Sequence, residues 1–188
     1  ESNDLPDISD MALTVYEDES LDFSLGAFDI DSADESLVFS ITDYPNNGTL
    51  IEQRAIAYYN YTPYEDFFGE DTFIISVTDG EDVASATIII NVENVNDVPI
   101  AADISLSGDD QDPEGNISID FSDFISDVDE DELTIQTIGS VNDGDNLTTL
   151  LGGTLIYNEN YSYSYNPIAG FDMMLYKVDD GISESSIE

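Results

Sequence analysis

The chain has 188 residues, of which 43 are Asp or Glu and two are Lys or Arg, for a formal net charge of −41 at pH 7. This charge excludes nucleic acid and anionic membrane surfaces as partners, because almost no cations are present to neutralise phosphate. Hydrophobic residues still make up 41% of the chain, which is enough to build folded cores. No run approaches the ~18 apolar residues that a membrane helix needs, so we expect no direct membrane insertion.

Short alternating runs bounded by turn residues predict β-strands, because side chains on a strand point alternately to opposite faces. In the run 71–79, Phe73, Ile75 and Val77 share one face. The Asp79-Gly80 turn leads to an alternating partner at 86–92, and Asp-Gly between such runs is a strong hairpin signal. Earlier strands are predicted at Leu13/Val15, Leu21/Phe23/Leu25, 38–42 and 56–62.

The same order of elements returns in the second half of the chain. Asn3-Asp4-Leu5-Pro6 recurs as Asn96-Asp97-Val98-Pro99, and the runs at 117–121, 133–135 and 174–178 repeat those at 21–25, 39–41 and 73–77. About seven short strands per unit, with turns every 8–12 residues, is typical of an immunoglobulin-like sandwich. We therefore predict an all-β chain of two tandem immunoglobulin-like β-sandwich domains, at residues 1–97 and 98–188.

The second domain departs from the first at its end. After Asp180-Gly181 only residues 182–188 remain, whereas the first domain continues from Gly80 through Val92. We expect domain 2 to lack most of its last strand, either because the chain is cut short or because a strand comes from elsewhere. In the second case the protein is a filament subunit, and residues 1–10 of a neighbouring subunit fill the edge by β-strand addition.

Acidic residues recur at matching places in the two units. Glu17, Asp29-Ile30-Asp31 and Asp79-Gly80 are followed by Glu114, Asp127-Val128-Asp129 and Asp180-Gly181. Self-repulsion at this net charge opposes the compact state, and cations bound at the recurring carboxylates relieve it. Because hard oxygen ligands suit calcium, the pattern predicts Ca²⁺ sites.

Simpler interpretations exist for each motif alone. An isolated Asp-Gly is commonly a hairpin turn, and an isolated Asp-x-Asp is commonly a solvated loop. The calcium interpretation therefore depends on the repetition of these motifs at matching places in the two units. Asp127-x-Asp129-x-Asp131 also opens like an EF-hand loop. Glu132 and Ile138 stand where that loop needs Gly and a closing Glu, so we reject it.

Two stretches resemble the tandem cadherin-like repeats of large bacterial surface and adhesin proteins, and more remotely the cadherins. They are Tyr61-Thr-Pro-Tyr-Glu-Asp-Phe-Phe-Gly-Glu-Asp-Thr-Phe-Ile-Ile-Ser-Val-Thr-Asp-Gly80 and Val92-Glu-Asn-Val-Asn-Asp-Val-Pro99. The resemblance covers domain 1 and most of domain 2. It implies calcium at the junction, bound by the base of one domain, the linker and the top of the next.

The resemblance also implies ligands, residue by residue. The interdomain set is Glu17, Asp66, Asn94, Asn96, Asp97, Asp127, Asp129 and Asp180. A partial site at the upper end of domain 1 takes Asn3, Asp4, Asp29, Asp31 and Asp79. Asn94 stands where the cadherin linker has Asp, and Val98-Pro99 follow Asp97 without the usual further Asn, which leaves the number of ions open. Domain 2 has no clear counterpart of Asp66.

Catalysis finds little support in the residues. The chain has no His and no Cys, so no Ser-His or Cys-His arrangement can form, and nothing singles out a carboxylate pair for glycoside hydrolysis. We predict a non-enzymatic, extracellular, calcium-rigidified structural or adhesive module of a longer bacterial surface protein. Its expected partners are neighbouring repeats or subunits, and a surface glycan or protein ligand.

An alternative function is an accessory or carbohydrate-binding module of a secreted enzyme, which an exposed aromatic platform would favour. Tyrosines do cluster at 58–61 and at 157–165. They follow strand parity, however, so we predict that they pack within the sandwiches rather than stack on sugars. Lys177 lies on the outward parity, and we expect it to be solvated and close to acids.

Overall fold

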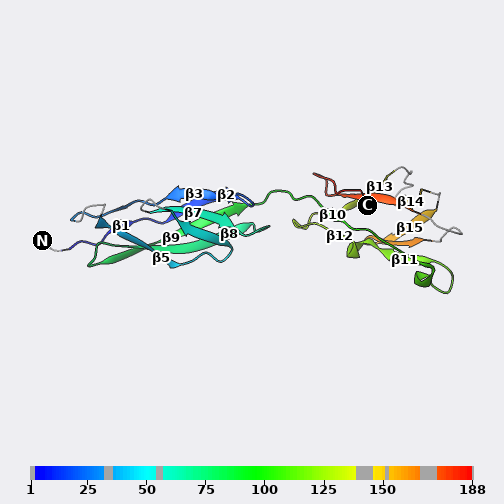
Figure 1. Cartoon of the computed structure of the whole chain (residues 1–188), viewed down its shortest axis with the longest axis horizontal. Coiled ribbons are helices and arrows are strands. Elements are labelled where there is room, and N and C mark those ends of the chain that lie inside the picture. The colour runs from blue at the N-terminus through cyan, green and yellow to red at the C-terminus, as the bar shows by residue number, and fades with distance from the viewer. Residues whose placement is uncertain are drawn as a thin grey trace. The chain divides into compact units, whose positions relative to one another are not determined.

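The computed structural model describes residues 3–31, 36–53, 57–138, 146–150, 153–165 and 173–187 (Figure 1). It divides into two units, Glu1–Val95 and Asn96–Glu188, called unit 1 and unit 2 below. Each is built from β-strands, and the described residues include no α-helix. This confirms the predicted fold class. No helix in the described part of the chain is long and apolar enough to span a membrane.

Unit 1 is a sandwich of two main sheets. Its strands are β1 (Asp7–Ile8), β2 (Met11–Tyr16), β3 (Leu21–Ser24), β4 (Ala27–Phe28), β5 (Val38–Asp43), β6 (Gly48–Glu52), β7 (Tyr58–Pro63), β8 (Gly69–Thr78) and β9 (Val83–Glu93) (Figure 1). One sheet has the order β2-β9-β8-β5 and the other β3-β7-β6, with β1 and β4 paired separately. The pair β2 and β9 is parallel, while the remaining pairs of unit 1 are antiparallel.

Alternation along β8 and β9 builds the core of unit 1, as predicted. Phe73, Ile75 and Val77 are buried, and so are the β9 residues that follow the same parity, while Thr72 and Thr87 are exposed. The core between the two sheets contains Val15, Phe23, Leu25, Tyr59, Tyr61, Phe73, Ile75, Ile88 and Ile90. Fully burying a side chain such as Ile or Phe contributes about 1.5–3 kcal/mol, so these residues dominate the stability of the unit.

Unit 2 follows the same plan. Its elements are β10 (Ile100–Ala101), the 3₁₀ helix η2 (Gly108–Asp110), β11 (Ile117–Asp120), the 3₁₀ helix η3 (Phe121–Asp123), β12 (Ile125–Ser126), β13 (Thr134–Ile138), β14 (Leu147–Thr148), β15 (Thr154–Glu159), β16 (Ser162–Tyr165) and β17 (Leu175–Asp179). The sheets are β11-β16-β15-β14 and β13-β17, with β10 paired to β12. The Phe121 ring meets Tyr163 and Tyr176 edge-on, at centroid distances of 5.4 and 5.3 Å, in the middle of the core.

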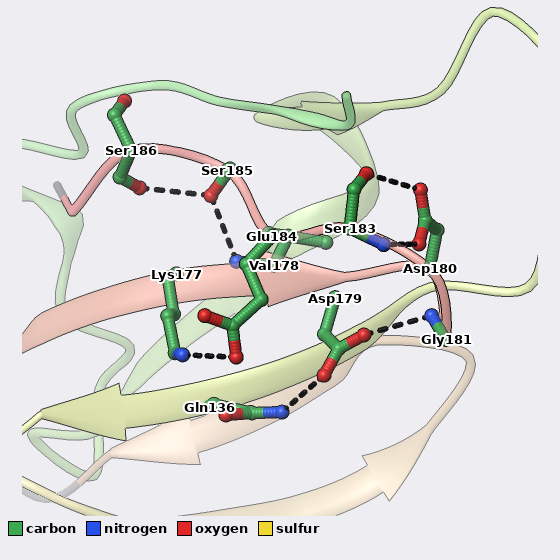
Figure 2. Close-up of polar contacts among 10 residues, drawn as sticks. All are labelled: Gln136, Lys177, Val178, Asp179, Asp180, Gly181, Ser183, Glu184, Ser185 and Ser186. Carbon is green, nitrogen blue, oxygen red and sulfur yellow. Dashed lines mark hydrogen bonds and ion pairs between the residues drawn. The ribbon is translucent and has the colours of Figure 1, made fainter. Parts of the chain in front are cut away.

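In unit 1, β8 and β9 form a long hairpin. At the end of unit 2, β17 and the described residues after it form the first part of a corresponding hairpin. After Asp179 the chain turns at Gly181 and forms a bridge from Asp179 to Glu184, and Ser185 N donates to Val178 O at 2.8 Å. Ser185 Oγ also accepts from Val178 N at 2.9 Å (Figure 2). No strand as long as β9 follows among the residues described up to Ile187. Among the described residues of unit 2, a bridge at Glu184 therefore stands where unit 1 has the strand β9.

Several details differ from the sequence prediction. The strand expected at 56–62 is β7, which begins at Tyr58, and Ile56 lies outside the described residues. Phe121 begins η3 instead of extending β11, because the Asp120 carboxylate accepts from Ser122 N at 3.0 Å and caps the helix. The pairs β1–β4 and β10–β12 were not predicted, since strands of two residues leave no alternating pattern.

The prediction for the tyrosines holds for four of the seven, whereas Tyr157 is 38% exposed and Tyr58 and Tyr161 are half-buried. Tyr59, Tyr61, Tyr163 and Tyr165 are buried in the two cores. Lys177 is close to an acid, as expected: it forms an ion pair with Glu184 (Figure 2). Its side chain is only 18% exposed, however, because the segment after Gly181 folds back over β17.

A buried carboxylate fastens the connection between β5 and β6 of unit 1. Asp71 is only 2% exposed and accepts hydrogen bonds from Tyr61 Oη at 2.8 Å and from the backbone N–H groups of Asn46 and Asn47, both at 3.0 Å. Burial, followed by the hydrogen bond to Asp71, raises the pKa of Tyr61. Gly48 completes the arrangement, because a Cβ there would lie 2.6 Å from the Tyr61 ring.

Candidate metal centres

Each unit carries an acidic cluster that joins its first residues to two loops. We call these the upper clusters. That of unit 1 contains Asn3, Asp4, Asp29, Asp31, Asp79 and Asp82. That of unit 2 contains Asn96, Asp97, Asp127, Asp129, Asp131, Asp180 and Ser183. The loops follow β4 and β8 in unit 1, and β12 and β17 in unit 2.

Three hydrogen bonds organise the upper cluster of unit 2. Asn96 Nδ2 donates to Asp180 Oδ2 at 3.0 Å, which ties the entering chain to the turn after β17. Asp97 N donates to Asp129 Oδ2 at 2.7 Å, and Asp129 N donates to Asp127 Oδ1 at 2.9 Å. These bonds therefore hold the carboxylates of the Asp-x-Asp pair and of Asp180 around the first residues of the unit.

The same three bonds recur in unit 1. Asn3 Nδ2 donates to Asp79 Oδ2 at 2.9 Å, Asp4 N to Asp31 Oδ2 at 3.1 Å, and Asp31 N to Asp29 Oδ1 at 3.0 Å. Asn3 also donates to Asp82, in the place where Asn96 donates to Ser183. Because the loops of the two units differ in length, the recurrence follows three-dimensional position rather than a fixed sequence spacing.

Backbone donors keep the turn aspartates ionised. Asp180 Oδ1 accepts from Ile182 N and Ser183 N, both at 2.6 Å, and Asp79 Oδ1 accepts from Glu81 N at 2.7 Å and Asp82 N at 2.8 Å. These donors lower the pKa of both carboxyls, with help from the side chains of Asn3 and Asn96. Both carboxylates therefore stay negative well below neutral pH.

Crowding of carboxylates has the opposite effect and raises the pKa of a carboxyl group. Carboxylate oxygens of Asp127, Asp129 and Asp131 lie within 4.8 Å of one another. Desolvation, followed by the charges of Asp127, Asp129 and Asp180, raises the pKa of Asp131. In unit 1 a hydrogen bond with the Asp29 carboxyl, then desolvation, raises the pKa of Asp31. Mutual repulsion of this kind is what a bound cation relieves.

Three oxygen atoms in the upper cluster of unit 2 provide a test of fit for a cation. Asn96 Oδ1, Asp127 Oδ2 and Asp129 Oδ1 are buried, and none has a hydrogen-bond partner among the described residues. Leaving a buried acceptor unsatisfied costs about 1–3 kcal/mol, and more for a charged group. Carboxylate and amide oxygens are ligands that calcium accepts, so the residues present fit this ion.

The remaining residues that the resemblance assigns to the interdomain site belong to unit 1, toward the end at which β9 finishes. Glu17 is only 1% exposed, its N–H donates to Glu93 O at 2.9 Å, and its Oε1 accepts from Val95 N at 2.5 Å. Asp66 lies on an exposed turn with φ of 58°, and Asn94 is also exposed. Within unit 1, Glu17 is therefore attached to the segment that follows β9, whereas Asp66 and Asn94 face solvent.

Glu114, which matches Glu17 in sequence order, does not match it in structure. It is exposed in a turn where Asp112 Oδ1 accepts from Asn116 N at 2.8 Å. The reason is that η2 and this turn precede β11, so unit 2 has no long strand in the place of β2.

Sequence reasoning also missed three members of the clusters. Asp131 was set aside together with the EF-hand interpretation, although its spacing of two residues from Asp129 was a usable signal. Asp82 and Ser183 share a position three residues after the aspartate of each Asp-Gly turn. Comparing the two units position by position would have found both.

The sequence profile of the family described as Bacterial Ig domain matches this chain twice, at residues 3–91 and 96–188. The two matches take in nearly all of the sequence, and the chain therefore belongs to this family as a tandem pair. No curated protein matches it.

Solved cadherin ectodomains share the fold. Protocadherin Gamma B2 extracellular cadherin domains 1–5 align with a TM-score of 0.58 and 14% identity, covering 100% of this chain and 38% of that one. Drosophila N-cadherin EC1-4 aligns with a TM-score of 0.51 and 14% identity, covering 96% of this chain and 47% of that one. The chain thus spans less than half the length of these cadherins, and identity this low shows the fold alone. With the family match, these alignments confirm the predicted tandem of cadherin-like, immunoglobulin-like repeats.

An enzyme structure also aligns, but weakly. An endo-fucoidan hydrolase from glycoside hydrolase family 107 gives a TM-score of 0.43 and 17% identity, covering 96% of this chain and 28% of that one. A likeness at this level supports no statement about activity.

Proposed function

We propose that this chain is a pair of calcium-binding immunoglobulin-like modules with a structural or adhesive role in a longer extracellular bacterial protein. The observation that carries the proposal is the hydrogen-bonded acidic cluster that recurs in both units. A cluster needed only to cap a turn has no reason to gather several carboxylates around an Asn side chain twice.

In unit 2, the residues that would hold calcium are Asn96, Asp127, Asp129, Asp131 and Asp180. Asn96, Asp127 and Asp129 offer the three acceptor oxygens described above, and Asp131 and Asp180 add negative charge beside them. Calcium takes about 6–8 oxygens in forgiving geometry, so water or further protein oxygens complete the set. When bound, the ion neutralises carboxylates that otherwise repel.

The cadherin resemblance extends this site to the preceding repeat, through Asp97 of the linker and through Glu17, Asp66 and Asn94 of unit 1. At ~4 Å each pair of like charges costs about 1 kcal/mol in water and several times more near protein. We therefore propose that calcium stiffens the junction between repeats, and that the empty junction is more flexible. The upper cluster of unit 1 would bind calcium more weakly in this chain, as a partial site.

Small-angle X-ray scattering of the 188-residue chain tests the stiffening. We expect calcium to narrow the distribution of the chain's radius of gyration relative to that of chelator-treated protein. Asp129→Asn removes one charge from the upper cluster of unit 2 and should abolish most of this change. Asp31→Asn removes the corresponding charge from the upper cluster of unit 1 and serves as the matched control, which should respond to calcium like the parent chain. Equal responses of the two variants would show that the junction ion has been assigned to the wrong residues.

Exposed aromatic rings support a second, weaker proposal, a carbohydrate-binding accessory role. Tyr44 and Tyr64 are 61% and 52% exposed, Phe68 is 46% exposed, and Tyr64 N donates to Asn47 O at 2.8 Å, which links their two loops. Under this proposal, neutral polysaccharide in a native gel retards the chain, and the double substitution Tyr64→Ala and Phe68→Ala removes the retardation. Identical mobility with and without polysaccharide would exclude this role for the sugars tried.

A further inference from the structure

The outer face of the β2-β9-β8-β5 sheet of unit 1 differs from the rest of this acidic chain. It is made by the side chains that alternate with the core residues, with Thr72, Ile74 and Ser76 on β8 lying opposite Ile89, Thr87 and Ser85 on β9. Ala12 and Thr14 of β2 and Ser40 of β5 extend it on both sides. We call this surface the outer sheet face.

No ionisable side chain lies in the described centre of the outer sheet face, although charged residues make up 24% of the chain. Carboxylates lie at its margins: Glu70 near the start of β8, Glu93 at the end of β9, Asp43 on the edge strand β5 opposite Ile74, and Asp10 before β2, whose Oδ1 accepts from Thr87 N at 2.7 Å. A surface free of charge at its centre and acidic at its rim loses little hydration energy when it is covered.

The hydroxyl groups on this face also bind one another. Ser76 and Ser85 share a hydrogen bond of 2.7 Å, and Thr42 Oγ1 lies 3.3 Å from both Ser76 Oγ and Ile74 O. Because these hydroxyls already have protein partners, removing water from them costs less than for free hydroxyls. Around these three hydroxyls, the face presents the side chains of Thr14, Thr72 and Thr87 together with the half-buried Ile74 and Ile89.

The fold does not require an uncharged face here. β13 pairs with β17 in the register of β5 with β8, so that Gln136 lies opposite Lys177 as Ser40 lies opposite Ser76. On that face of unit 2, Lys177 forms an ion pair with Glu184, and Gln136 Nε2 donates to Asp179 Oδ2 at 2.6 Å (Figure 2). The absence of charge is therefore a property of unit 1 and not of the architecture.

We propose that the outer sheet face of unit 1 is a self-association surface, on which a second copy of this chain packs the same face. A net charge of −41 makes contact between most surfaces of two copies repulsive. A two-fold axis through this face brings two uncharged centres together and leaves the carboxylates at a solvated rim. Two sheets with the same twist can pack face to face in an aligned arrangement.

The size of the face sets the strength of the association. Four strands about 4.8 Å apart, with a rise of about 3.3 Å per residue, give a face of about 500 Å² per copy. The total of about 1,000 Å² lies at the lower limit for specific interfaces, so we expect a weak, reversible dimer. Because salt screens repulsion beyond ~8 Å at physiological ionic strength and beyond ~3 Å at 1 M, the dimer should strengthen with salt. It should form without calcium.

Sedimentation equilibrium of the 188-residue chain in chelator, over a wide range of protein and salt concentrations, tests this proposal. We expect a monomer–dimer equilibrium in which Thr72→Glu weakens association at least tenfold, because the two-fold axis places two new carboxylates in one interface. Thr49→Glu, an exposed threonine of β6 in the other sheet of the same unit, is the matched control and should associate like the parent chain. Melting temperatures of both variants verify that they fold.

A chain that stays monomeric at the highest protein and salt concentrations overturns the proposal. So does a dimer that both variants weaken equally, since the contact would then lie elsewhere. A dimer that survives Thr72→Glu unchanged is equally contrary.

Discussion

Calcium added to chelator-treated protein is expected to raise its melting temperature by about 10–20 °C. An ion that binds only the folded state stabilises it by about 2.7 kcal/mol at a hundredfold excess over the dissociation constant. Extracellular modules bind calcium around 10⁻⁴–10⁻³ M, so about 10 mM calcium gives that excess for the tighter end of the range. In domains of this size 1 kcal/mol shifts the melting temperature by about 4–8 °C. Differential scanning calorimetry measures the shift.

The charge of the chain requires a control for this shift, because any divalent cation screens carboxylates. Magnesium at the same ionic strength is suitable, since it demands near-octahedral geometry and dehydrates reluctantly. We expect it to produce a small fraction of the calcium effect. Asp127→Asn should reduce the calcium effect and Asp123→Asn should not, because Asp123 is an exposed residue of η3 outside the upper cluster. Equal shifts with the two metals would indicate general screening and no specific site.

Asp71→Ala is expected to lower the free energy of unfolding of unit 1 by about 3 kcal/mol or more. The substitution leaves the buried Tyr61 hydroxyl without its acceptor, together with the N–H groups of Asn46 and Asn47. Each buried group left unsatisfied costs about 1–3 kcal/mol. Urea unfolding followed by tyrosine fluorescence measures the loss.

Glu70→Ala is the matched control for Asp71→Ala. Glu70 precedes Asp71 on β8, carries the same charge and is exposed, so its removal should change stability by no more than about 0.5 kcal/mol. If Asp71→Ala is equally mild, the carboxylate does not hold the β5–β6 connection.

The strands of the two cores could be predicted because burial imposes a period of two residues on each of them. Phe73, Ile75 and Val77 show that period without interruption, and their partners across the Asp79-Gly80 turn repeat it. The turn into η3 could not be predicted in the same way. It depends on the Asp120 carboxylate capping Ser122, a local hydrogen bond that leaves the hydrophobic pattern of 117–121 unchanged.

The upper clusters were only partly predictable, for a related reason. Asn3 and Asn96 could be recognised because each opens its unit with the same four-residue motif, and the structure brings each to the Asp-Gly turn of its own unit. Asp131 continues the two-residue spacing of Asp127 and Asp129, but its position beside them depends on the path of the loop after β12. Glu114 failed as a counterpart of Glu17 because a similar place in sequence order does not ensure an equivalent strand before it.

Isothermal titration calorimetry of the 188-residue chain with calcium, after exhaustive chelation, tests the central claim most directly. We expect saturable binding with a dissociation constant of about 10⁻⁴–10⁻³ M or tighter. Asp127→Asn should remove the tightest phase, whereas Asp123→Asn should retain it. A titration without saturable heat up to about 10 mM calcium, or one that the two variants leave equally unchanged, would contradict the assignment of these clusters as calcium sites.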